Sequence, residues 1–189
     1  MSYEIHAIES FILKKTTLKE YDSIFEVYTR EFGIIQIIGY GILRPASKLR
    51  QSMDMCSLIT IEIIRGREFW ILIGAKQSRK LLPVHRFGLW EAISSIIKKY
   101  SGDHDEYASE IFEYVVSVLE VFKEYEYDST FSKSILLYIT MRILYVQGYW
   151  PHTLHALIFE SPIIQALALI EKERRQFESD IDMIIKRIV

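Results

Sequence analysis

The sequence LITIEIIRGREFWILIGA, residues 58–75, predicts two strands joined by a tight turn. In its first half three isoleucines alternate with Thr60 and Glu62, which is the period of a half-buried strand. The segment RGRE, residues 65–68, contains Gly66, which we expect to supply a positive φ in the turn. The apolar run that follows then returns as the partner strand.

Three further strand-like segments precede this hairpin, with a turn about every ten residues. They are IHAIESFILKK at 5–15, SIFEVYTREFG at 23–33 and IIQIIGYGIL at 34–43. Five short strands at this spacing are typical of a small closed sheet. The sequence therefore predicts a five-stranded antiparallel barrel in the N-terminal part of the chain.

Beyond Pro83 the apolar residues recur at helical spacing. The first expected helix buries a face that runs from Ala108 to Phe122, and Asp103 with Glu106 resembles a capping box at its start. Two more helices are expected to follow. The sequence therefore predicts an all-α part after the barrel.

The second expected helix covers residues 132–147 and stops at Gly148, and the third begins near Pro162. Along the third helix apolar residues recur at heptad-like spacing, interrupted by Arg174. Packing of this seam on the chain's own bundle is favoured over a dimer seam.

The predicted fold class is α+β in two parts, and the charge differs between them although the net charge is −2. Residues 1–82, the predicted barrel domain, hold 12 Lys and Arg and 9 Asp and Glu. Residues 83–189, the predicted helical bundle domain, hold 11 and 16. Within residues 39–80 there are 8 basic residues against 3 acidic ones, so a basic patch is expected on a mildly acidic protein.

The basic residues gather in the segments next to the predicted strands. In GYGILRPASKLRQSM, residues 39–53, three cations and no acid interrupt an apolar run. Cations follow the phosphates of a nucleic acid, and exposed aromatic side chains stack on its bases. The candidate DNA-binding residues are Arg44, Lys48, Arg50, Arg65, Arg67, Lys76, Arg79 and Lys80, with Tyr40 and Trp70 as candidates for stacking. By composition alone, a solvated barrel rim with buried aromatic residues is the alternative.

Patterns for catalysis or metal binding are weak. The single cysteine, Cys56, excludes an internal disulfide and a multi-cysteine zinc site, and we expect it to be buried. His152 and His155 have a spacing that suits one face of a helix, but two ligands do not make a zinc site. The sequence contains no G-x-S-x-G motif. We therefore expect no enzymatic activity, no metal, no cofactor and no small-molecule substrate.

The sequence also favours a cytoplasmic protein. The N-terminus lacks the layout of a secretory signal. The apolar stretch at 34–43 is about half as long as a membrane span, and a longer one carries Arg142 in its middle. No membrane association is expected.

Four stretches, taken in order, carry a resemblance to a known family. They are AIESFILKKTTLKEYDSIFEVYTREFG (7–33), IIGYGILRPASKLRQSMDMCSLITIEIIRGRE (37–68), IFEYVVSVLEVFKE (111–124) and MRILYVQGYWPHTL (141–154). The second is the most specific, with a Gly-x-Gly-like strand end, a basic Pro/Ser loop and a strand ending in Arg-Gly. The last contains a Gly-Tyr-x-Pro-x-Leu step. Over about the first 155 residues the chain resembles the family of the bacterial DNA repair protein RecO, a recombination mediator.

This resemblance implies an oligonucleotide/oligosaccharide-binding (OB) barrel followed by a helical domain. It implies non-catalytic binding of single- and double-stranded DNA, annealing of complementary strands and loading of recombinase. It also implies RecR and the tail of the single-strand-binding protein as partners, at the nucleoid in the bacterial cytoplasm.

The chain departs from the family pattern after the Gly-Tyr-x-Pro-x-Leu step. Many relatives carry a four-cysteine zinc site there, whereas HTLHALIFESP (152–162) contains no cysteine. The chain therefore resembles a shortened, metal-free member. The acidic second half and the heptad-like tail favour an alternative function, a protein-interaction adaptor of the repair machinery that has lost direct DNA binding.

Overall fold

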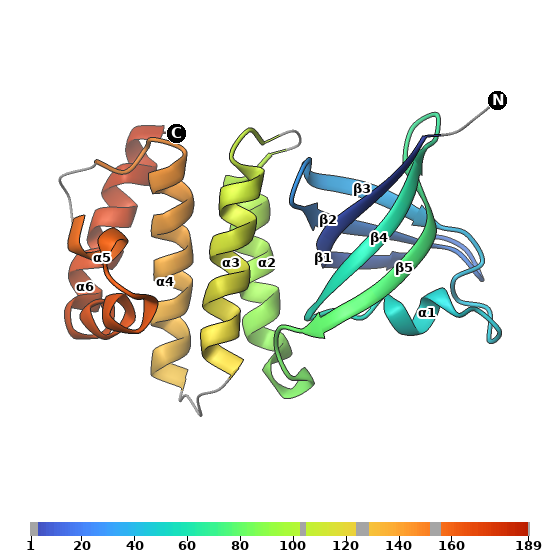
Figure 1. The fold of residues 1–189 in the computed structure, drawn as a ribbon. Helices are drawn as coiled ribbons and strands as arrows, with labels where there is room; N and C mark the ends of the chain where they lie inside the picture. The colour runs from blue at the N-terminus through green and yellow to red at the C-terminus, as the bar shows by residue number, and fades with distance from the viewer. Residues whose placement is uncertain (1–3, 103–104, 124–128, 152–155, 189) are drawn as a thin grey trace.

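In the computed structural model of the chain, which describes residues 4–102, 105–123, 129–151 and 156–188, a β-barrel lies beside a bundle of helices (Figure 1). The strands of the barrel are β1 (Ile5–Thr17), β2 (Ser23–Thr29), β3 (Gly33–Gly39), β4 (Ser57–Arg65) and β5 (Trp70–Lys80). A short helix, α1 (Leu49–Ser52), lies between β3 and β4. After a 3-10 turn, η1 (Val84–Arg86), come α2 (Phe87–Tyr100), α3 (Ala108–Lys123), α4 (Ser129–Val146), α5 (Ala156–Glu160) and α6 (Ile163–Ile188). The predicted α+β class, a five-stranded barrel followed by helices, is confirmed.

The strands close into a barrel in the order β1-β2-β3-β5-β4. Four of the neighbouring pairs are antiparallel, but β3 and β5 pair in parallel at Ile37–Trp70 and Ile38–Ile71. The prediction of a wholly antiparallel barrel is therefore wrong at this seam. The reason is parity, because a closed ring with an odd number of strands cannot alternate in direction all the way round.

Two apolar cores meet in the wall of the barrel. The first fills the barrel and contains Ile12 and Phe25, whereas the second lies between the outside of the barrel and the helices and contains Phe11 and Trp90. Side chains on the two faces of β1 thus pack into different cores, because successive side chains of a strand point to opposite faces. Trp90 on α2 also donates its indole N–H to the carbonyl of Ile12 at 2.9 Å. The division into domains at residue 82 stays a prediction, and an apolar core spans it.

The two turn glycines behave differently. Gly148 follows α4 with φ of 77°, which agrees with the expected end of that helix. Gly66 does not have the positive φ that the sequence suggested. Its N–H donates to the carbonyl of Phe69 at 3.0 Å, and a Cβ added at Gly66 would lie 2.4 Å from that oxygen. Glycine is therefore needed at this position because the carbonyl oxygen of Phe69 comes too close for a Cβ atom, and not because the backbone requires a positive φ.

The long C-terminal helix packs on the chain's own bundle, as expected. Leu167, Ile170 and Phe177 on α6 are fully buried among residues of α3 and α4. Arg174 lies at the side of this seam, 3.5 Å from a carboxylate oxygen of Glu171. Within the described part of the chain, no helix is long and apolar enough to cross a membrane.

Two of the patterns found in the sequence fall outside the described residues. They are the cap residue Asp103 and the histidine pair His152 and His155. Among the residues that are described, no group of three or more His, Cys, Asp or Glu side chains could hold a metal ion.

Candidate nucleic-acid interface

The basic loop, defined as residues 40–52, is anchored in the barrel core close to both of its ends. Ile42 is 1% exposed and Met53 is 3% exposed, and both pack inside the barrel. Near its start, Gly41 adopts φ of 64° and donates its N–H to the carboxylate of Asp22 at 2.8 Å. Between these two anchors, Arg44, Lys48 and Arg50 are exposed to solvent.

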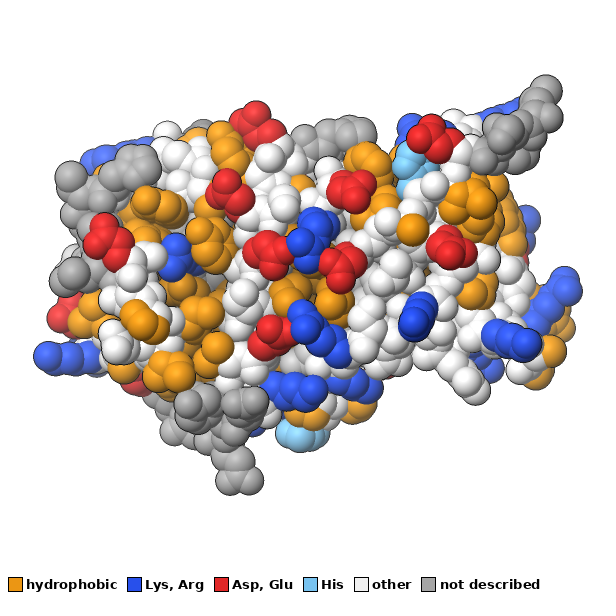
Figure 2. All heavy atoms as spheres, viewed as in Figure 1, with side chains coloured by type: hydrophobic (Ala, Val, Ile, Leu, Met, Phe, Trp, Pro, Cys, Tyr) orange, Lys and Arg blue, Asp and Glu red, His pale blue; other side chains and the backbone are white. Residues whose placement is uncertain are grey.

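The three cations of the basic loop are exposed and share one end of the molecule. Figure 2 shows Lys and Arg side chains at the end of the barrel that carries α1 in Figure 1. The guanidinium of Arg44 lies 5.5 Å from the ring centroid of Tyr21, whereas Lys48 and Arg50 extend from the loop and α1. In the described part of the chain, none of the three forms an ion pair with a carboxylate. This end of the barrel therefore carries uncompensated positive charge.

A fourth cation, Lys15 on β1, belongs to the same surface. Its ammonium lies 5.5 Å from the ring centroid of Phe25. Partial burial, and to a smaller extent the positive charge of Arg50, lower the pKa of Lys15. The sequence analysis missed this residue, because Lys15 precedes Arg50 by 35 positions; the polar end of the first strand, KKTT, was its only signal. A phosphate placed between Lys15 and Arg50 would relieve their repulsion.

The hairpin tip, defined as residues 65–70, joins β4 to β5 and carries Arg65, Arg67 and Trp70. Trp70 is half-buried: Phe32 stacks on it with 5.7 Å between ring centroids, and His6 meets it edge-on at 5.2 Å. The Arg65 guanidinium lies 4.9 Å from the centroid of the Trp70 ring. Trp70 is thus part of an aromatic cluster whose accessible edge is shared with Arg65.

Tyr40, the other predicted stacking residue, begins the basic loop. The side chain of Tyr40 is 56% exposed, whereas that of Trp70 is half-buried. An exposed phenol ring can stack on a base without displacing another side chain. Of the two predicted aromatic residues, Tyr40 is the more accessible.

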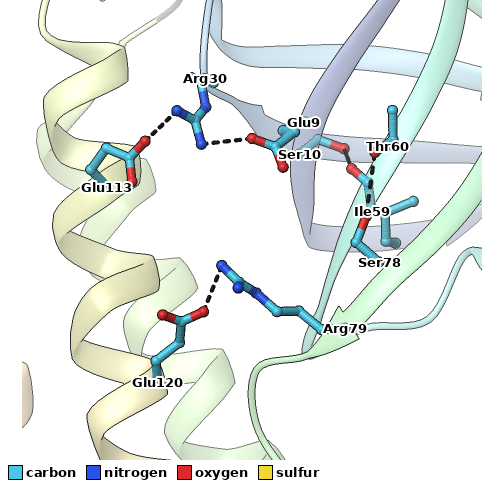
Figure 3. Close-up of polar contacts among 9 residues, drawn as sticks. All are labelled: Glu9, Ser10, Arg30, Ile59, Thr60, Ser78, Arg79, Glu113 and Glu120. Atoms are coloured by element: carbon cyan, nitrogen blue, oxygen red, sulfur yellow. Dashed lines mark hydrogen bonds and ion pairs between the residues drawn. The ribbon is translucent and has the colours of Figure 1, made fainter.

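The remaining predicted cations lie along β5, away from the hairpin tip. Lys76 is exposed in the middle of the strand. At the far end, Arg79 pairs with Glu120 of α3 at 2.5 Å (Figure 3), and Lys80 pairs with Asp54 at 2.7 Å. Because β5 runs from Trp70 to Lys80, its two ends are separated by about 33 Å. The structure thus brings the basic-loop cations together, but places Arg79 and Lys80 elsewhere and beside carboxylates.

Another cation, Arg30, lies at the seam between the barrel and the helices, where carboxylates of the same chain neutralise it. Arg30 lies between Glu9 of β1, at 2.6 Å, and Glu113 of α3, to which it is also paired (Figure 3). Its guanidinium is 5.1 Å from the ring centroid of Phe112. Figure 2 shows basic and acidic side chains interspersed along this seam. Arg30 and Arg79 therefore form ion pairs that connect the barrel to α3.

Comparison with known protein families matches the barrel. The family model described as Recombination protein O N terminal matches residues 1–77. This span contains β1–β4, most of β5, the basic loop and the hairpin tip, whereas α2–α6 follow it. Among curated proteins, no match to the chain is found. Residues 1–77 therefore match the RecO N-terminal domain family, which confirms the resemblance for the first two motif stretches, 7–33 and 37–68; the stretches at 111–124 and 141–154 lie beyond the matched residues.

Proposed function

We propose that this protein is a non-catalytic, DNA-binding recombination mediator of DNA repair. The observation that carries the proposal is the uncompensated basic surface on its RecO-type domain. Arg44, Lys48 and Arg50 project from one anchored loop, and Lys15 lies beside Arg50. Because a phosphate backbone gains most from cations that the protein does not already neutralise, this surface is the best-suited DNA contact.

Annealing of complementary strands requires no bond chemistry. Two strands must come close while the repulsion between their phosphates is lowered and their bases stay free to pair. The basic loop provides cations that contact phosphates, and Tyr40 provides an exposed ring for transient stacking on unpaired bases. Such contacts read no sequence, which suits a protein that must act on any DNA.

The rest of the predicted DNA-binding set extends this surface to different degrees. Arg65, Arg67 and Lys76 are exposed, and a strand crossing the barrel from the basic loop could reach them. Arg79 and Lys80 contact DNA only if phosphates displace Glu120 and Asp54. We therefore assign the strongest phosphate contacts to the basic loop.

The family points to the partners of this function. We propose that the protein binds single- and double-stranded DNA and acts with RecR and the tail of the single-strand-binding protein to load recombinase. Its place of action would be the nucleoid in the bacterial cytoplasm. A pull-down with purified RecR and single-strand-binding protein tests these two partners directly.

Replacement of Arg44, Lys48 and Arg50 together by Ala tests the DNA site. Fluorescence anisotropy of labelled oligonucleotides should show about 10- to 100-fold weaker binding at low salt. The slope of log affinity against log salt for single strands should fall by about 2, since each lost phosphate contact removes about 0.7. The matched control replaces Lys172, Arg175 and Lys186 by Ala; these are exposed on α6 and carry the same total charge. Equal losses in both variants would remove the basic loop from the site.

A protein-interaction adaptor is the second candidate. Its support is that Arg79 and Lys80 are already paired with Glu120 and Asp54, and that residues 83–189 are net acidic. It predicts retention of RecR in a pull-down while oligonucleotides do not bind even at low salt.

A further inference from the structure

An open groove with a volume of about 550 Å³ lies between the hairpin tip and the C-terminal end of α2. Glu26 of β2 and Gln36 of β3, which are partners in the strand register, line it from the barrel. Trp70 forms one wall, and Lys98 of α2 contributes to the opposite one. A volume in this range suits a small ligand or one unit of a larger one.

The hairpin side of the groove offers the guanidinium plane of Arg65, beside the accessible edge of Trp70, as a surface on which a flat ring can stack. Trp70 is held by Phe32 and His6, so its ring has a fixed position, and Arg65 lies over it at 4.9 Å. Bases stack on aromatic rings and on the plane of an arginine guanidinium. The groove therefore fits an unpaired nucleobase better than a stacked base pair, which has no free face.

The charges that line the groove balance one another, because two cations, Arg65 and Lys98, stand against two carboxylates. Two carboxylates line it, Glu26 and Glu68. Glu26 is engaged by the ammonium of Lys98 at 3.3 Å, whereas Glu68 is exposed and, within the described residues, forms no ion pair. A free carboxylate repels phosphate but accepts hydrogen bonds from N–H groups.

The bases differ in how well they can satisfy such an acceptor. Cytosine, adenine and guanine each carry an exocyclic amino group, and a glutamate that accepts from the cytosine amino group is a known mode of base readout. Thymine has no amino group, and its ring N–H lies between two carbonyl oxygens that a carboxylate repels. A groove containing Glu68 should therefore distinguish these bases.

We propose that this groove holds one unpaired base of a bound single strand, and that Glu68 accepts a hydrogen bond from the amino group of that base. The protein then prefers strands of amino-bearing bases to strands of thymine. This inference rests on the proposed function, because it assigns a base to the strand that the barrel is proposed to bind.

Labelled oligo(dC) and oligo(dT) of equal length, titrated at slightly alkaline pH, test the preference by fluorescence anisotropy. We expect the wild-type protein to bind oligo(dC) at least about fivefold more tightly. In Glu68→Gln the ratio of the two affinities should fall toward one, since a neutral amide discriminates less and repels phosphate less. The matched control, Glu31→Gln, removes the same charge from an exposed residue outside the groove and should keep the wild-type ratio.

The possible outcomes separate this inference from the proposed function. Equal affinities for both strands in the wild-type protein, or a preference that survives Glu68→Gln, would overturn the base pocket and leave DNA binding in place. Loss of the preference in Glu31→Gln as well would assign it to net charge and also overturn the pocket. Failure of both oligonucleotides to bind at low salt would overturn the proposed function, and the base pocket with it.

Discussion

Cys56 shows how one side chain can be made chemically inert by its position. It directly precedes β4, is 2% exposed and has a backbone φ of 64°. Burial, and secondarily the negative charge of Asp54, raise the pKa of its thiol to about 11. The thiolate, which is the reactive form, is therefore almost absent at neutral pH.

Because the thiol of Cys56 is buried, we expect it to lose its proton only at alkaline pH. The ¹³Cβ chemical shift of the single cysteine should change with a midpoint near pH 11 in the folded protein and near 9 in denaturant. Since the folded state keeps the proton to higher pH than the unfolded chain, this group's contribution to stability falls as pH rises between these values. The Cys56→Ala variant should lack this part of the alkaline loss in the free energy of unfolding. A folded-state midpoint at or below 9 would contradict the burial of the thiol.

At the residue scale, the sequence identifies cations but not what neutralises them. Arg79 and Lys80 were predicted as DNA contacts because the last strand was expected to end at residue 75, in a basic segment, whereas β5 extends to Lys80. Their partners, Glu120 and Asp54, lie 41 and 26 positions away, and no spacing rule connects them. Lys15 was missed for the same reason. These ion pairs join residues that are far apart in the sequence and meet only in the folded chain, so local sequence patterns cannot predict them.

At the scale of elements, period and turn spacing located the strands well, whereas the short helices α1 and α5 and the 14-residue helix α2 were not predicted. The alternation at 58–64 predicted β4, which spans Ser57–Arg65. In contrast, α1 has four residues, Leu49–Ser52, which is too short for a helical period to appear. The parallel seam between β3 and β5 could have been deduced, because five strands in a ring require one. The alternation of apolar and polar residues predicts individual strands, but it does not predict how the strands pair.

Helix α3 also masks one of the barrel's cations. In Glu120→Gln the guanidinium of Arg79 loses its carboxylate partner and becomes available to phosphate. We expect DNA affinity at low salt to rise about two- to fivefold, in line with the small free energy of an exposed ion pair. Glu110→Gln, an exposed position on the same helix with no ion pair among the described residues, is the matched control for net charge in the same anisotropy titration. An equal gain in both variants, or none in Glu120→Gln, would show that Arg79 does not reach DNA.

At the scale of the whole molecule, barrel and helices share buried contacts that should make them unfold together. Trp90 is fully buried, packs edge-on against Phe11 at 5.6 Å and donates its N–H to the carbonyl of Ile12. Trp90→Phe keeps a ring but leaves that carbonyl without its side-chain donor. We expect a loss of about 1–3 kcal/mol in the free energy of unfolding.

Urea unfolding followed by far-UV circular dichroism and by near-UV aromatic signals measures this loss. Both signals should shift together, because the helices and the barrel depend on the same core. Tyr149→Phe, at a side chain that is 50% exposed, serves as the control and should not shift either transition. If Trp90→Phe moved the helical signal alone, the two parts would be independent folding units.

The closure of the barrel limits how other proteins can attach to it. In an open sheet the outermost strand leaves a row of backbone amide and carbonyl groups to which a peptide can bind as an extra strand. Here the fifth strand is hydrogen-bonded to the third, and the fourth to the first, so the ring has no outermost member. Where the strands are paired, a protein that attaches to this domain must therefore recognise side chains on its loops and outer faces, the same layer that carries the exposed positive charge.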